Sequence, residues 1–71
     1  MTRRQAAILA FIATYLREHT GHSPALRDIM AGCGIKSPAT AYYNILVLQA
    51  KGHIGWEPRL ARTIRIIKAL K

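Results

Sequence analysis

The sequence predicts a mainly α-helical domain in which three helices are followed by a small two-stranded β-hairpin. Apolar residues recur at helical spacing in three successive segments, and glycines separate these segments. After Gly52 the apolar pattern changes from helical to alternating, which is the period of a strand. The 71 residues are close to the lower limit for a self-sufficient hydrophobic core, so we expect one domain over residues 1–71.

The first helix is expected to start at Thr2 and to end before Gly21. Thr2 and Gln5 have the spacing of a capping box, in which each side chain bonds the backbone N–H of the other residue. The apolar positions that follow at helical period are Ile8, Leu9, Ile12, Tyr15 and Leu16. These positions predict one face that is buried in the core.

The second predicted helix is short. We expect Ser23 as its N-cap and Pro24 at its first position, where proline is well tolerated. Its inward-facing residues are Leu26, Ile29 and Met30. The helix is expected to end at the glycine turn of residues 32–34, after which Ile35 points back into the core.

The third helix, from Ser37 to Lys51, is the segment around which we expect the chain to be organised. The Ser37 hydroxyl can cap the first turn, and Pro38 occupies the first helical position. Lys51 stands at the negative end of the helix dipole, and Gly52 stops the helix. The stripe expected to face the core consists of Ala41, Ile45 and Leu48.

The opposite side of this third helix carries no acidic residue. It is formed by small, hydroxyl-bearing or apolar side chains, namely Ala39, Thr40, Tyr42, Tyr43 and Leu46. A helix that is buried on one side and free of acids on the other, in a basic chain, is typical of a helix that reads DNA.

Two segments after Gly52, His53–Trp56 and Thr63–Ile66, have the alternating pattern of strands. The turn that links them carries Arg59 and Arg62, and we interpret Trp56 as an apolar anchor beneath the hairpin. Two helices joined by a short glycine turn form a helix-turn-helix, and a hairpin after the second of them is a wing. The predicted architecture is therefore a winged helix-turn-helix.

The charge of the chain favours a polyanionic partner. Eleven Lys and Arg residues against three acids give a net charge of +8 and a pI near 10.7. Because the cations are spread over several elements, nucleic acid is favoured over an anionic membrane surface. No apolar run approaches the roughly 18 residues of a membrane span. The single cysteine excludes an internal disulfide and fits a reducing cytoplasm, where we expect the protein.

We expect no catalytic, metal or cofactor site. The metal-ligating side chains His19, His22, Cys33 and His53 match no common zinc spacing. Three acids and scattered histidines offer no convergent nucleophile–base pair, so an enzyme is disfavoured. We interpret Cys33 as a small core residue.

Short motifs occur in order along nearly the whole chain. They are Thr2-x-Arg4-Gln5, Gly21-His22-Ser23-Pro24, Leu26-Arg27-Asp28-Ile29, Gly34-Ile35-x-Ser37-Pro38, Leu48-x-x-Lys51-Gly52-x-Ile54, and Pro58 followed by Arg62-x-Ile64-x-Ile66. Each motif alone is weak, whereas the ordered set is fairly specific. In these motifs the chain resembles the N-terminal DNA-binding domain of LexA, the SOS-response repressor of bacteria.

The resemblance implies a winged helix-turn-helix that binds a two-fold symmetric operator as a dimer. It places the base contacts at the start of the third helix, on Ser37, Ala39, Thr40, Tyr42 and Tyr43. The family commonly has polar or charged residues where Ala39, Tyr42 and Tyr43 stand, so we expect a different operator sequence. The family's C-terminal domain, whose Ser-Lys dyad performs self-cleavage, has no counterpart among these motifs, so we expect no self-cleavage by this chain.

We therefore predict sequence-specific binding to double-stranded DNA, with repression of transcription as the outcome. The expected phosphate contacts are Arg27, Lys36, Lys51, Arg59 and Arg62. Two alternatives stay open. One is a protein-interaction adaptor that uses Tyr42, Leu46 and Val47, and the other is an architectural nucleic-acid-binding module with little sequence preference.

Self-association is expected to be weak in solution and stronger on a palindromic operator, because one copy covers only one half-site. Two apolar segments are candidates for the contact, the tail from Ile66 to Leu70 and the pair Leu46 and Val47. We favour the tail, because pairing through Leu46 would occupy the helix that must enter the groove.

Overall fold

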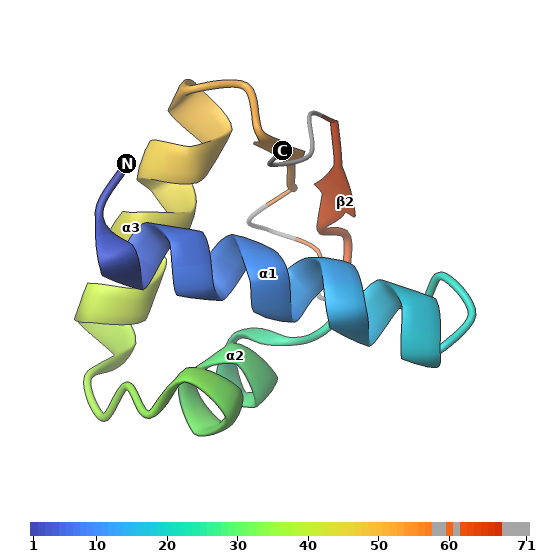
Figure 1. Cartoon of the computed structure of the whole chain (residues 1–71), viewed down its shortest axis with the longest axis horizontal. Helices are drawn as coiled ribbons and strands as arrows, with labels where there is room; N and C mark the ends of the chain where they lie inside the picture. The colour runs from blue at the N-terminus through green and yellow to red at the C-terminus, as the bar shows by residue number, and fades with distance from the viewer. Residues whose placement is uncertain (58–59, 61, 68–71) are drawn as a thin grey trace.

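The computed structural model describes residues 1–57, 60 and 62–67. It contains three helices and an antiparallel two-stranded sheet, in the order α1 (Arg3–Glu18), α2 (Leu26–Cys33), α3 (Pro38–Ala50), β1 (Ile54–Gly55) and β2 (Arg65–Ile66) (Figure 1). The prediction of a mainly helical winged helix-turn-helix is confirmed. In Figure 1, α1 crosses the front of the molecule between α2 and the hairpin, and α3 runs along one side.

The start of α1 is the predicted capping box. The backbone N–H of Gln5 donates to Oγ1 of Thr2 over 3.1 Å, and the N–H of Thr2 donates to Oε1 of Gln5 over 3.2 Å. Two N–H groups that no helical carbonyl can reach are satisfied in this way. Gly21, just beyond the helix, has a φ of +87°, which is the left-handed region that favours glycine.

The prediction that Ser23 caps the second helix is wrong. The helix begins at Leu26, and the carboxylate of Asp28 accepts the N–H of Ala25, its N-cap residue, over 2.8 Å. The Ser23 hydroxyl accepts instead from the N–H of Ile64, over 3.0 Å. Ser23 therefore joins the segment before α2 to the chain leading into β2, and Asp28 takes over the capping role.

Both ends of α3 follow the prediction. The Ser37 hydroxyl accepts from the N–H of Thr40 over 3.3 Å, and Pro38 is the first helical residue. At the other end, Gly52 has a φ of +81°, and the N–H of His53 donates to the carbonyl of Leu48 over 3.0 Å. This arrangement satisfies one of the last free carbonyls of the helix.

The core lies where the three helices meet, and each helix contacts the other two. Its buried apolar residues are Ile8, Leu9, Ile12, Ile29, Ile35, Ala41, Ile45, Leu48, Ile54 and Ile64. Full burial of an isoleucine or leucine side chain stabilises the folded state by about 1.5–3 kcal/mol. Because the predicted stripe of α3 is entirely within this set, its other side is held outward.

The hairpin pairs Ile54 with Ile66 and Gly55 with Arg65. Its strands are two residues each, shorter than the predicted segments. Beyond Gly55 a side-chain hydrogen bond replaces backbone pairing between the strands. The N–H of Glu57 donates to Oγ1 of Thr63 over 3.0 Å. As predicted, Trp56 packs against the core.

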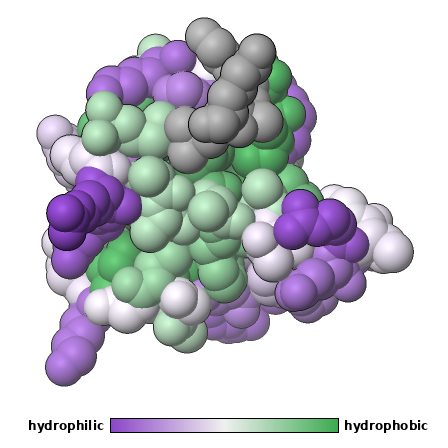
Figure 2. Space-filling view, in the orientation of Figure 1, coloured by the Kyte–Doolittle hydropathy of each residue, from purple (hydrophilic) through white to green (hydrophobic). Residues whose placement is uncertain are grey.

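Figure 2 shows an apolar surface over the face that α1 presents, bordered by hydrophilic groups. Ala7 and Ala10 of α1 are exposed. Exposed small apolar residues are ordinary on a folded surface and call for no functional explanation. Among the described residues, no helix is both long and apolar enough to cross a membrane.

Candidate nucleic-acid interface

The turn between α2 and α3 sets the angle of the helix-turn-helix. Gly34 adopts a φ of +67°, and the next residue, Ile35, donates its N–H to the carbonyl of Met30 over 2.9 Å. The Ile35 side chain is only 5% exposed, so it anchors the turn in the core. The left-handed glycine and the buried isoleucine together fix where α3 begins.

Five residues of the segment from Ser37 to Tyr43 were predicted to contact bases, and they occupy the outward side and flank of α3. Ser37, Ala39, Tyr42 and Tyr43 are exposed, and Thr40 is half-buried. Tyr43 is the most open, at 64%. Leu46, about one turn beyond Tyr43, is 38% exposed and extends the same surface. The geometry brings these side chains together, and their contact with bases stays a prediction.

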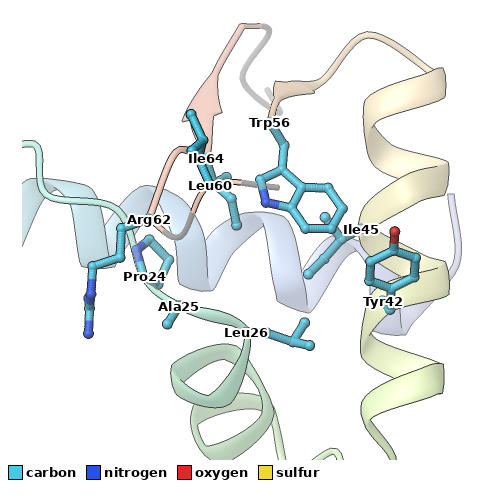
Figure 3. Close-up of a pocket in the computed structure, with 9 residues that line it drawn as sticks. All are labelled: Pro24, Ala25, Leu26, Tyr42, Ile45, Trp56, Leu60, Arg62 and Ile64. Carbon is cyan, nitrogen blue, oxygen red and sulfur yellow. The ribbon is translucent and has the colours of Figure 1, made fainter. Parts of the chain in front are cut away.

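Tyr42 is shared between this surface and the hairpin. Its ring meets Trp56 edge-on, with centroids 5.3 Å apart and an interplanar angle of 72°. A pocket of ≈ 210 Å³ lies here between α2, α3 and the hairpin, with Leu26 and Ile45 on its walls (Figure 3). Because its ring is packed in this way, Tyr42 is less free than Tyr43 to adapt to a bound molecule.

Two amide side chains of α3 face the protein, and the sequence analysis did not single them out. Nδ2 of Asn44 donates to the carbonyl of Thr40 over 2.8 Å, and Oδ1 of Asn44 accepts from Nε2 of Gln5 over 3.3 Å. Nε2 of Gln49 donates to the carbonyl of Trp56 over 3.1 Å. Helical spacing could have predicted the burial of Asn44, because it lies three residues from Ala41 and continues the buried stripe.

The predicted phosphate contacts differ in their surroundings. Arg27, Lys36 and Lys51 are exposed, and they lie at the start of α2, in the turn before α3 and just after α3. Arg59 lies outside the described residues. Lys36 and Lys51 therefore place positive charge at the two ends of α3, and Arg27 adds an exposed cation on α2.

Arg62 points back onto the protein. Its Nη1 donates to the carbonyl of Ser23 over 3.1 Å and lies 3.5 Å from a carboxylate oxygen of Asp28. Nη1 also donates to the Tyr15 hydroxyl over 3.5 Å, which together with the charge of Asp28 raises the pKa of Arg62. The guanidinium therefore keeps its charge, but that charge is already partly balanced by Asp28.

The cysteine and histidines form no metal site in the part of the chain that the structure describes, where no three His, Cys, Asp or Glu side chains gather around a common point. Cys33 is half-buried at the end of α2, and burial raises the pKa of its thiol. His19 stacks on Tyr15, with ring centroids 3.7 Å apart. These contacts account for Cys33 and His19 as packing residues.

Comparison with known proteins identifies relatives that match most of this chain. A family model described as "LexA DNA binding domain" matches residues 1–63. The LexA repressor of Herpetosiphon aurantiacus is 36% identical over 69 residues, which are 97% of this chain and 32% of that protein. The LexA repressor of Petrotoga mobilis is 41% identical over 54 residues, which are 76% of this chain and 26% of that protein. The transcription regulator LexA of Synechocystis is 33% identical over 67 residues, 94% of this chain and 32% of that protein.

This chain thus spans about a third of the length of the curated relatives it matches. The matched residues 1–63 include all three helices and β1, the elements that build the surface described above. From its fold and from the match over most of its length, the chain belongs to the LexA DNA-binding domain family.

Proposed function

We propose that this chain is the DNA-reading domain of a transcriptional repressor. In this proposal α3 enters the major groove of a specific duplex site, and occupation of that site blocks transcription. One observation carries it: α3 is buried on one side against the core and leaves an acid-free side exposed in a chain of net charge +8. Membership of a family of DNA-binding domains supports the same conclusion.

Affinity and specificity come from different residues. Lysines and arginines that neutralise phosphates release counterions, which supplies binding energy on any sequence. We assign this role to Arg27, Lys36 and Lys51, and with them to Arg59 and Arg62. Base edges are read in the groove by side chains near the start of α3, namely Ser37, Ala39, Thr40, Tyr42 and Tyr43.

The operator is expected to be palindromic and to bind two copies. One domain presents one α3 and therefore reads one half-site, and two half-sites about one helical turn apart match a two-fold symmetric pair. Self-association is weak without DNA and strengthened on it. Ile67, which is 59% exposed at the end of the hairpin, supports the tail as the contact; residues 68–70 of that tail lie outside the described residues.

The function is regulatory, with no catalytic role or cofactor, and its setting is the cytoplasm at the bacterial nucleoid.

Two rival functions use the same surface differently. A protein-interaction adaptor would bury Tyr42, Leu46 and Val47 against a partner. An architectural module would bind nucleic acid through charge alone and would not distinguish sequences.

Selection of bound duplexes from a random pool, followed by titration, tests the proposal. The enriched duplex is compared with a scrambled duplex of the same length at one salt concentration. A repressor domain should prefer the enriched duplex by a factor of about 10³ or more. A ratio near one would favour the architectural module, and binding without salt dependence would favour the adaptor.

Sedimentation of the enriched palindrome at saturating protein should give two copies per duplex, and one copy would refute the pairing.

A further inference from the structure

We propose that α3 reads its half-site mainly through the C5-methyl groups of thymine, so that the base pairs beneath it are T·A pairs. This inference rests on the proposed function, in which α3 lies in the major groove. It concerns which chemical groups of the groove the helix recognises, and it follows from which side chains the fold leaves available.

The two side chains of α3 that could read adenine, Asn44 and Gln49, are hydrogen-bonded within the protein. Asn and Gln recognise adenine by two simultaneous hydrogen bonds from one amide. In Asn44 both amide atoms are used within the protein, by Gln5 and by the Thr40 carbonyl. The Gln49 amide donates to the Trp56 carbonyl, and its Oε1 atom is buried. Neither amide can present the required pair of atoms to a base.

The side chains that read guanine and cytosine are missing from the helix. Arg and Lys recognise guanine, whereas Asp and Glu accept from cytosine. The sequence of α3, PATAYYNILVLQA, contains none of these four residues. Its remaining polar groups at the surface are hydroxyls, which both donate and accept and therefore discriminate poorly between bases.

What α3 does present is an apolar strip. Tyr43, Tyr42 and Leu46 are 64%, 41% and 38% exposed, and Ala39 continues the strip toward the start of the helix. The spacing of these residues, three, four and seven positions from Ala39, places them on one side of a helix. Thymine is the base that offers a methyl group in the major groove. An apolar strip gains energy there by removing that methyl group from water.

The charges at the ends of the strip favour DNA over a protein partner. Lys36 lies just before α3 and Lys51 just after it, and both are exposed. A major groove offers phosphates along both rims and base edges between them, so cations at both ends of an apolar strip complement it. The surplus of positive charge over the whole chain acts in the same direction.

Uracil substitution tests the inference directly, because uracil keeps every hydrogen-bonding group of thymine and lacks only the methyl group. In the duplex enriched from the random pool, each thymine of the half-site is replaced in turn by uracil. Each contacted methyl group should be worth about fourfold in affinity, the value of one buried methylene. The same number of uracils in the flanking sequence is the control and should leave the affinity unchanged.

Protein variants assign the effect to α3. Leu46→Ala should weaken binding to the thymine duplex and abolish the effect of uracil at one position. Tyr43→Phe should retain uracil sensitivity, because the ring makes the contact. Ala10→Ser, a neutral change of an exposed side chain on α1, is the control and should leave uracil sensitivity intact. Thermal unfolding of each variant verifies that it folds.

The outcomes separate this inference from the proposed function. If uracil has no effect while the enriched duplex still outcompetes the scrambled one, methyl reading is wrong and the proposed function stands. A half-site composed of G·C pairs would likewise overturn methyl reading alone. If no sequence is enriched from the pool, the proposed function fails and this inference fails with it.

Discussion

Nε2 of Gln5 donates a hydrogen bond to Oδ1 of Asn44 over 3.3 Å, and this bond joins the first turn of α1 to the middle of α3. Both side chains are buried, at 6% and 7% exposure. The same Gln5 side chain accepts from Thr2 in the capping box. One glutamine thus caps the first helix and holds the helix that we propose to read DNA.

Replacing Asn44 with alanine should lower the free energy of unfolding by about 1–3 kcal/mol, because the Gln5 amide is then buried without its partner. Urea denaturation measures this loss. In a double-mutant cycle with Gln5→Ala, the coupling energy should be at least about 0.5 kcal/mol, as for residues in one network. If the loss of stability in the double mutant equals the sum of the two single losses, the hydrogen bond does not contribute as stated.

Replacing Gly34 with alanine should destabilise the domain by about 1–2 kcal/mol, because alanine is strained at the φ of +67° found there. A Cβ atom at this position would meet nothing within 4 Å, so the cost is one of backbone conformation alone. Gly34→Asn is the matched control and should cost less, since asparagine tolerates this conformation. Equal stability of the glycine and alanine proteins in thermal unfolding would refute the assignment.

Affinity for DNA should fall steeply with salt, with a log–log slope of roughly −4 to −7 if about five to eight phosphates are neutralised. Lys36→Ala should weaken binding on all sequences and reduce this slope by about 1. Arg62→Ala should change the slope less, because Asp28 lies 3.5 Å from its guanidinium and already balances part of the charge. Titrations at several salt concentrations compare the two variants, and a larger change for Arg62 would show that it leaves Asp28 on binding.

The Cys33 thiol should react slowly with iodoacetamide in the folded protein. Burial raises its pKa, so at a given pH less of it is the reactive thiolate than in the unfolded chain. A raised pKa favours the protonated form in the folded state. The resulting stabilisation is complete below the ordinary thiol pKa of about 8.5 and is lost as the pH rises through the folded-state value. Equal alkylation rates in buffer and in urea would contradict this.

Local patterns in the sequence predicted the helix ends well, because both partners of each cap lie within a few residues. Thr2 with Gln5, and Ser37 with Thr40, are such pairs. Ser23 was assigned wrongly because its partner, the N–H of Ile64, is 41 residues away. A serine before a proline gives the same sequence pattern whether its hydroxyl caps a helix or accepts a hydrogen bond from a distant part of the backbone.

The exposed side of α3 was also predictable from periodicity, whereas its chemistry was not. The phase of the stripe formed by Ala41, Ile45 and Leu48 correctly placed Tyr43 outward. The roles of Asn44 and Gln49 depend on Gln5 and Trp56, which come from other elements and have no helical register with α3. The same holds for Arg62, whose contact with Asp28 required the folded positions of α2 and the hairpin.

The central claim, that the outward side of α3 reads DNA sequence, is tested most directly by Tyr43→Ala. Tyr43 is 64% exposed, so the variant should keep the stability of the parent protein. Its affinities for the enriched and the scrambled duplex are measured at one salt concentration. We expect a loss of about 1–3 kcal/mol on the enriched duplex and nearly none on the scrambled one. An equal loss on both duplexes, or no loss on either, would contradict the claim.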